Sequence, residues 1–125
     1  MELPHEGAFT RLGRSDIHGI GVFAILDIIK GTPLFKGDEK TRTVTVDAAN
    51  LEPCPASIKK LYEDFCPLND GKYECPENFN QLTISWYLNS SKSPNVECRE
   101  NLLFYASRDI KAGEELTVDY DTYSE

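Results

Sequence analysis

Basic residues are scarce in this 125-residue sequence, which has 13 Lys and Arg against 21 Asp and Glu and a net charge of −8. An excess of negative charge disfavours a sequence-independent grip on a phosphate backbone, so we expect no direct binding of nucleic acid. A cationic partner fits this charge better, although an acidic surface also serves ordinary solubility.

The sequence also lacks closely spaced cysteines and long apolar runs. Its four cysteines are separated by 12, 9 and 23 residues, so no Cys-x-x-Cys pair begins a zinc site, and we expect free thiols and no bound metal. The opening MELPHEGAFT has no basic region followed by an apolar stretch, and no run approaches the ~18 apolar residues of a membrane span. These absences predict a soluble intracellular protein in a reducing compartment, without membrane contact.

What the sequence does have is apolar material for one core. Hydrophobic residues make up 40% and aromatic residues 10% of the chain, which is typical of a globular protein. A chain of this length buries about two thirds of its unfolded surface, enough for a single core. We therefore expect one domain over residues 1–125.

Short runs of β-forming residues separated by turn residues predict a mainly β fold. The expected strands are GVFAI at 21–25, TRTVTV at 41–46, LLFYA at 102–106 and ELTVDY at 115–120. In SIKKLYEDF, Ile58, Leu61, Tyr62 and Phe65 have the spacing of one helical face, which predicts the one clear helix. The alternation in QLTISWYL favours a strand over 81–88, with a short helix as the alternative.

The segment HGIGVFA contains Gly19 and Gly21 in a pattern that also occurs in dinucleotide-binding folds. That interpretation needs a buried strand before the glycines and a helix after them, but RLGRSDIH is too polar and Gly31 and Pro33 shorten any helix. We favour a tight turn that enters a strand. A small ligand lying against the exposed backbone of this turn is a further possibility.

Two polar segments follow later in the chain. NSSKSPN, residues 89–95, has the composition of a turn, because Asn and Ser bond their own backbone and Pro94 restricts one dihedral angle. The C-terminal SRDIKAGEELTVDYDTY has a polar turn at 111–114 and then a strand. Taken alone, this pattern predicts a hairpin with an edge strand.

In their order, the glycine turn at residues 19–21, the segment 89–95, which we call the Asn loop, and the C-terminal motif at residues 113–120 resemble the SET-domain family of protein-lysine methyltransferases. The family's Asn-His-Ser-x-x-Pro-Asn motif is matched here by Asn89, Ser91, Pro94 and Asn95. Its C-terminal motif is matched by Glu115, Leu116, Thr117, Asp119 and Tyr120, and Gly37 is similar to the glycine of its Tyr-x-Gly-Glu segment.

This resemblance implies a fold of several small curled antiparallel sheets with a C-terminal pseudoknot and a short helical insert. The Asn loop and the C-terminal segment would cross in the pseudoknot. Residues from about 41 to 80 correspond to the variable insert of a single SET domain.

The resemblance also implies S-adenosylmethionine-dependent methyl transfer to the side-chain amine of a lysine in a basic protein or peptide, such as a histone. It assigns the methyl-donor site to Gly19, Ile20, Gly21, Asn89, Ser90 and Tyr120. It assigns the substrate channel to Phe35, Tyr87, Val118 and Tyr123, and Tyr120 is the expected catalytic residue. No metal is required, and the cellular location, cytoplasmic or nuclear, is left open.

Several positions depart from the family pattern. Ser90 stands at the usual His, Phe35 at the usual Tyr, and Lys92 at a cysteine that joins a zinc site in many members. No cysteine cluster follows Tyr120, so we expect no post-SET zinc module. Val118 replaces a frequent Phe or Tyr, which predicts room for higher methylation states. The alternative function is a weak or inactive SET-like module that binds the methyl donor or a basic peptide.

Overall fold

The computed structural model describes all 125 residues and divides them into two compact units, each described by itself. The first unit contains Met1–Lys40 and Thr83–Asp119, and the second contains Thr41–Leu82 and Tyr120–Glu125. Small sheets dominate both units, and there is one α-helix, so the predicted mainly β fold of several small sheets is confirmed. That residues 41–80 are a variable insert of a single domain stays a prediction.

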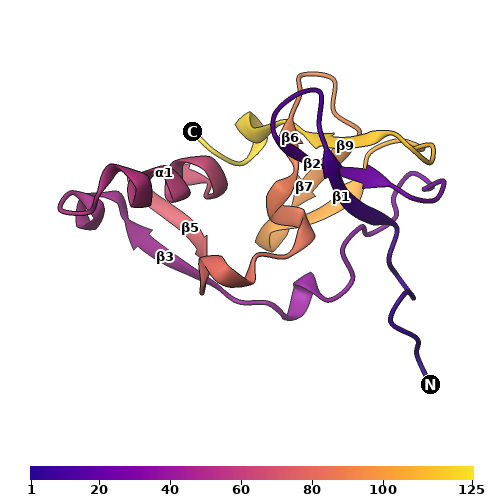
Figure 1. Cartoon of the computed structure of the whole chain (residues 1–125), viewed down its shortest axis with the longest axis horizontal. Coiled ribbons are helices and arrows are strands. Elements are labelled where there is room, and N and C mark those ends of the chain that lie inside the picture. Colours follow the sequence, from indigo (N-terminus) through magenta and orange to yellow (C-terminus); the bar gives the residue numbers. More distant parts are fainter. The chain divides into compact units, whose positions relative to one another are not determined.

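The first unit is built on a four-stranded sheet with the order β1-β2-β9-β6 (Figure 1). Its strands are β1 (Thr10–Arg14), β2 (Ile20–Ala24), β9 (Glu115–Val118) and β6 (Asn89–Ser90). β1 and β2 form an antiparallel hairpin, β2 pairs antiparallel with β9, and β9 pairs parallel with the short β6. A second hairpin joins β7 (Val96–Arg99) and β8 (Leu103–Ala106).

Apolar side chains of the central strands make the core of this unit. Val22 of β2 and Leu116 of β9 are opposite each other in the register, and both are fully buried. Val118, Val96 and Ile110 are also almost completely buried. Burial of each such side chain stabilises the fold by about 1.5–3 kcal/mol relative to exposure. The strands that carry the functional segments are therefore also the core strands.

The second unit combines a three-stranded sheet with the helix. The sheet has the order β3-β5-β4, from β3 (Thr43–Asp47), β5 (Lys72–Pro76) and β4 (Leu68–Asn69). Helix α1 (Ala56–Phe65) confirms the predicted helix, and its apolar face meets aromatic rings: Tyr62 lies edge-on to Phe79, with ring centroids 5.0 Å apart. The C-terminal residues join β4, since Leu68 O accepts a hydrogen bond from Glu125 N.

Two expectations about elements were wrong, and a third agrees with the structure. Ile84–Tyr87 is a 3-10 helix, so the favoured strand is wrong and the alternative of a short helix is confirmed. The buried positions Ser85 and Leu88 are three residues apart, and Leu88 N donates to Ser85 O. The stretch RLGRSDIH, judged too polar for a buried strand, supplies most of β1, an edge strand with mostly unburied side chains, so that judgement agrees with the structure. β9 is an interior strand and not an edge strand, because β6 pairs with its free side.

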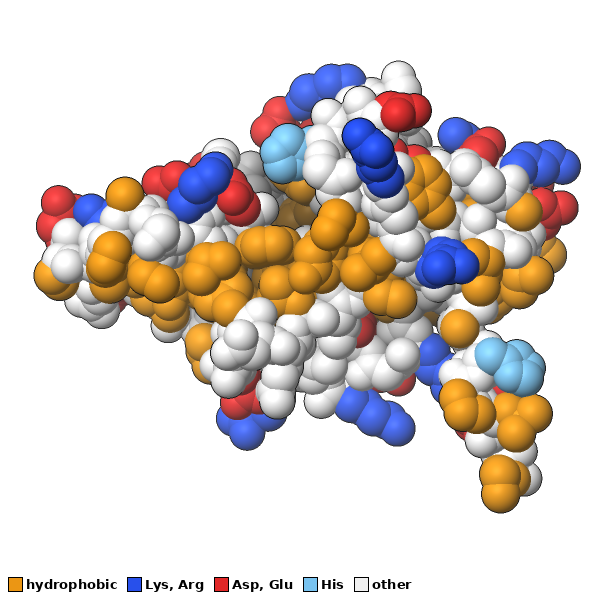
Figure 2. Space-filling model, in the orientation of Figure 1, with side chains coloured by type: hydrophobic (Ala, Val, Ile, Leu, Met, Phe, Trp, Pro, Cys, Tyr) orange, Lys and Arg blue, Asp and Glu red, His pale blue; other side chains and the backbone are white.

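Two further features bear on the expected environment. No helix in the structure combines the length and apolar character that crossing a membrane needs. No group of three or more His, Cys, Asp and Glu side chains is arranged to hold a metal ion, and all four cysteines are free thiols. On the face that Figure 2 shows, apolar side chains gather together, and acidic and basic side chains lie mostly around them.

Candidate functional site

Both ends of the Asn loop are hydrogen-bonded to the last core strand, β9. At its start, β6 pairs with β9 so that Asn89 is opposite Thr117 and Ser90 is opposite Val118. Past β6, Ser91 N donates to Val118 O at 3.0 Å. These contacts place the Asn loop across the C-terminal strand, as the expected pseudoknot requires.

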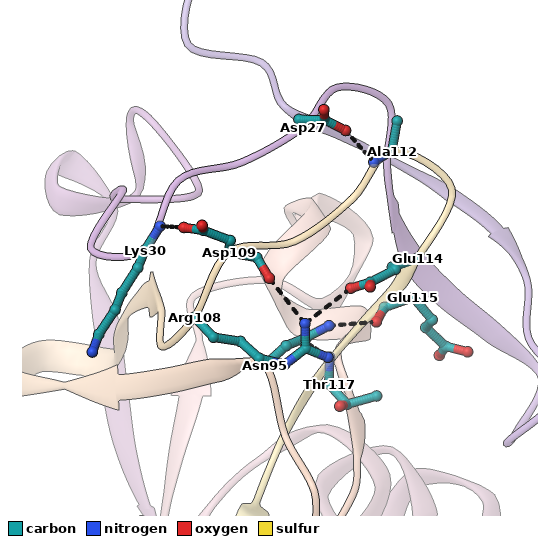
Figure 3. Close-up of polar contacts among 9 residues, drawn as sticks. All are labelled: Asp27, Lys30, Asn95, Arg108, Asp109, Ala112, Glu114, Glu115 and Thr117. Atoms are coloured by element: carbon teal, nitrogen blue, oxygen red, sulfur yellow. Dashed lines mark hydrogen bonds and ion pairs between the residues drawn. The ribbon is translucent and has the colours of Figure 1, made fainter.

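Asn95 closes the other end of this loop onto β9 (Figure 3). Its side-chain nitrogen donates to Glu115 O at 2.9 Å, and its side-chain oxygen accepts from Thr117 N at 2.8 Å. The residue is only 3% exposed. A buried amide that satisfies one backbone acceptor and one backbone donor fixes the register between loop and strand, because a slip would leave polar groups unpaired out of water.

Asn89 connects the pseudoknot to the glycine turn. Its side-chain nitrogen lies 3.0 Å from His18 O and 3.3 Å from Ile20 O, two carbonyl groups of the turn that precedes β2. The same nitrogen lies 2.9 Å from a carboxylate oxygen of Glu115. Asn89 is 7% exposed, and its side-chain oxygen takes part in none of these contacts. Two segments about 70 residues apart in the sequence thereby form one polar cluster.

The two positions of the turn, 19 and 21, require glycine for different structural reasons. Gly19 has a φ of +47°, a conformation that residues with a side chain rarely adopt, and a Cβ atom there would meet nothing within 4 Å. Gly21 has no such dihedral constraint, but a Cβ atom would overlap Glu115 Oε2 and come within 3.1 Å of Asn89 Nδ2. The predicted tight turn is present, with Ser15 N donating to Gly19 O at 2.8 Å.

Sequence reasoning missed two residues of this cluster, Ser15 and the side chain of Glu115. The Ser15 hydroxyl donates to Glu115 at 2.8 Å and 2.9 Å from the two carboxylate oxygens. It also accepts from Ile17 N at 2.9 Å and His18 N at 3.3 Å, which closes the turn on itself. A serine at the start of a polar turn is the only signal in the sequence, because its partner lies 100 residues away.

Phe35, an expected channel residue, lines a separate cavity of about 380 Å³ within the first unit. The other aromatic walls are Phe9, Phe104 and Tyr105, and Phe35 lies edge-on to Phe104 at 6.2 Å between ring centroids. Asp38, Glu39 and Lys36 add charged groups, and Lys36 forms an ion pair with Glu2. Neither Tyr87 nor Val118 is among the lining residues, so the structure does not bring these three expected channel residues together in this cavity.

Asp38 is the perturbed acid of this cavity. Burial raises the pKa of its carboxyl above the ordinary value, opposed by hydrogen bonds from Ser85 and Thr83, and the charge of Glu39 adds to the rise. The Ser85 hydroxyl donates to Asp38 Oδ2 at 2.6 Å. The carboxyl therefore keeps its proton to a higher pH than a solvated aspartate does.

Two other expected site residues lie in the first unit. Tyr87 ends the 3-10 helix Ile84–Tyr87 directly before β6 and is partly exposed. Val118 is 1% exposed and lies beside Ser90 in the sheet.

The expected catalytic tyrosine lies at the start of the last segment of the second unit. Tyr120 begins the 3-10 helix Tyr120–Thr122, and its ring is edge-on to Tyr123 with centroids 6.2 Å apart. Partial burial raises the pKa of the Tyr120 phenol, and the negative charge of Asp64 raises it further. Tyr120 as a whole is 37% exposed. Tyr120 is therefore a neutral phenol at physiological pH, able to donate one hydrogen bond.

Comparisons with known proteins agree with this geometry. The family model described as SET domain matches residues 19–121. Among solved structures, 222 chains match, and one is a candidate histone methyltransferase of Plasmodium falciparum. That structure aligns with a TM-score of 0.60 at 20% identity, over 90% of this chain and 93% of the other. A search of curated protein sequences found no match.

Proposed function

Because the chain belongs to the SET-domain family, we propose that it transfers a methyl group from S-adenosylmethionine to the side-chain amine of a lysine in a protein substrate. The observation that carries this proposal is the link between Asn89 and the carbonyl groups of His18 and Ile20. It joins two of the three motif segments into one cluster, and β9, which begins the third motif, lies between them in the sheet.

The cluster is suited to a ligand that has both polar and apolar parts. The backbone at Gly19 faces open space, so a ligand can approach its peptide groups closely. Ile17 and Ile20 keep 54% and 53% of their surface exposed beside it and offer an apolar surface. The Asn89 side-chain oxygen is not used by the protein contacts described above and is available as an acceptor. By its motif matches, the proposed methyl-donor site comprises Gly19, Ile20, Gly21, Asn89 and Ser90, with Tyr120 included from the C-terminal motif alone.

The chemistry requires a neutral lysine. With an ordinary pKa near 10.4, only about one lysine in a thousand is neutral near pH 7.4, roughly 4 kcal/mol uphill. Apolar surroundings lower this pKa because they disfavour the ammonium form. When bound, S-adenosylmethionine supplies a methyl group on a positively charged sulfur, and no metal is needed for the transfer. The task left to the protein is to exclude water and align the amine with the methyl group.

We propose that Tyr120 orients the reacting groups through its hydroxyl. Its raised pKa keeps the phenol protonated, so it can act as a hydrogen-bond donor throughout the physiological range. Tyr123, edge-on to it, is proposed as an aromatic wall of the lysine channel. Phe35, Tyr87 and Val118 are the further channel residues that the family resemblance implies.

The proposed substrate is a basic protein or peptide that contains lysine, with a histone tail as one candidate. The net charge of −8 supports this choice because it attracts a cationic partner. Direct binding of nucleic acid or membrane is not part of the proposal, and the proposed location is the cytoplasm or the nucleus.

Calorimetric binding of S-adenosylhomocysteine tests this function without knowledge of the substrate. The wild type is expected to bind saturably in the micromolar range, and Asn89→Ala to lose binding. Asn50→Ala, at an exposed position of the second unit, is the matched control and should bind as the wild type does. A wild type that does not bind would refute the enzyme proposal.

A second candidate is a SET-like module that binds the donor or a basic peptide but turns over slowly or not at all. Phe35 supports it, because a phenyl ring packed on Phe104 supplies no hydroxyl group where the family usually has one. Ser90 in place of the usual histidine points the same way. Binding of S-adenosylhomocysteine without methyl transfer across a panel of basic peptides would favour this candidate.

A further inference from the structure

We infer that Glu115 is a positioning residue, whose carboxylate holds the glycine turn and Asn89 in the geometry that binds the methyl donor. The inference rests on the proposed function, since it gives this role to a side chain that lies within the proposed donor site. Ser15 is its partner on the turn. We call Glu115, Ser15 and Asn89 the carboxylate clamp.

The carboxylate lies where three segments meet. It extends from the first residue of β9, accepts from the Ser15 hydroxyl, and accepts from the Asn89 side-chain nitrogen at 2.9 Å. Ser15 precedes the turn, and Asn89 begins β6. Asn89 Nδ2 also lies 3.2 Å from the Ser15 hydroxyl oxygen, so every pair within the clamp is in contact.

The contacts of the clamp require a hydrogen-bond acceptor at both side-chain oxygen positions of Glu115. The Ser15 hydroxyl has a single proton to donate, and its oxygen lies 2.8 Å and 2.9 Å from the two carboxylate oxygens. Its oxygen already accepts from Ile17 N and His18 N, and the Asn89 nitrogen is also a donor. A glutamine would turn an amide NH₂ group toward this set of donors. The clamp therefore specifies a carboxylate, and charge-assisted hydrogen bonds of this kind are about twice as strong as neutral ones.

The clamp matters for binding because, apart from the backbone hydrogen bond from Ser15 N to Gly19 O, the hydrogen bonds of the turn involve the Ser15 hydroxyl or the Asn89 side chain. Ile17, His18 and Gly19 are exposed, and Gly19 has the widest backbone freedom of any residue type. If the turn is mobile before binding, ordering it costs affinity, and a turn that is already ordered avoids that cost. Gly21 leaves room for the clamp, because any side chain there would displace the Glu115 carboxylate.

The test compares Glu115→Gln with Glu114→Gln. Glu114, one residue earlier, pairs with the partly exposed Arg108 and touches no part of the clamp (Figure 3). We expect Glu115→Gln to speed amide hydrogen exchange at Ile17 and His18 in the free protein and to weaken S-adenosylhomocysteine binding by about tenfold or more, the effect of losing one charged hydrogen bond. Glu114→Gln should change neither.

A second pair of variants separates positioning from general stability. Ser15→Thr keeps the hydroxyl and adds a methyl group, and Ser15→Val has nearly the same shape as Ser15→Thr but carries a methyl group in place of the hydroxyl. We expect Ser15→Thr to retain donor affinity and Ser15→Val to lose it to the degree that Glu115→Gln does. Asp27→Asn, which weakens a loop contact to Ala112 N away from the clamp, controls for mere destabilisation and should leave affinity unchanged.

The outcomes distinguish this inference from the proposed function. If the wild type binds S-adenosylhomocysteine and Glu115→Gln binds it equally well, the positioning role is refuted while the donor site stands. Faster exchange in the turn without a change in affinity refutes it too. If the wild type itself does not bind, the proposed function fails, and with it any role of the clamp in donor binding.

Discussion

Gly21→Ala is the substitution whose outcome the structure predicts most sharply. A methyl group at this position would overlap Glu115 Oε2, lie 2.9 Å from Cδ of the same side chain, and lie 3.1 Å from Asn89 Nδ2. The backbone conformation of Gly21 is not the obstacle, because its φ is not positive. The cost must come from displacing the carboxylate.

The size of this cost follows from the hydrogen bonds that the displacement breaks. A Glu115 side chain pushed away from the turn loses its contacts with Ser15 and Asn89, and hydrogen bonds to a charged group contribute about 1.5–3 kcal/mol each. The displaced carboxylate is hydrated by water, which offsets part of the loss. Alanine also lowers the entropy of the unfolded chain, which stabilises the folded state by about 0.4–1 kcal/mol. We expect a net loss of about 2–4 kcal/mol in the free energy of unfolding.

Urea unfolding of Gly21→Ala, Gly19→Ala and the wild type measures this difference. Gly19→Ala meets no atoms but is strained by its positive φ, so it should cost about 1–2 kcal/mol. Removing the Glu115 side chain should relieve the clash, so Gly21→Ala combined with Glu115→Ala should be less destabilised than the sum of the two single variants. A Gly21→Ala protein as stable as the wild type, or an additive double variant, would refute the reasoning.

Four further predictions concern the reaction and the cavity. Tyr120→Phe should lower the methylation rate by ~100-fold, measured on a basic peptide substrate, and an unchanged rate would remove it from catalysis. Tyr123→Ala should weaken donor binding or turnover; if both stay unchanged, it is not a channel wall. Because Val118 is small, mass spectrometry at long reaction times should find di- or trimethyl-lysine, and monomethyl-lysine alone would contradict this. Burial raises the pKa of Asp38, so the folded state binds this proton more tightly than the unfolded state, and this contribution to stability is lost as pH rises from ~4 through the raised pKa. Asp38→Asn should therefore gain stability relative to the wild type between pH 4 and pH 7 in urea unfolding, and an unchanged difference would exclude this linkage.

Much of the fold could be predicted because its signals are local. The helical spacing of Ile58, Leu61, Tyr62 and Phe65 identified α1, and apolar runs identified β2, β3, β8 and β9. Apolar periodicity reports which face of an element is buried, and it needs no knowledge of partners. The prediction failed where the buried positions do not follow the apolar pattern. In Ile84–Tyr87 the apolar residues alternate, but the buried positions, Ser85 and Leu88, are three residues apart.

Candidate site residues divide in the same way. Asn89, Gly19 and Gly21 could be named from short motifs, and the structure brings them into contact distance of one cluster. Ser15 and the role of the Glu115 side chain could not be named, because the hydrogen bond between them spans 100 residues. No local pattern records a pairing of that separation.

The sequence by itself determined the strand and helix material, the tight glycine turn, the excess of negative charge and the motif order that indicates the family. Only the tertiary structure decided that β9 is an interior strand, that β6 runs parallel to it, and that one carboxylate holds the turn and the Asn loop together. The physical reason is that propensity and periodicity act between near neighbours in the chain. Hydrogen bonds between distant polar groups form only where the folded core brings their strands side by side.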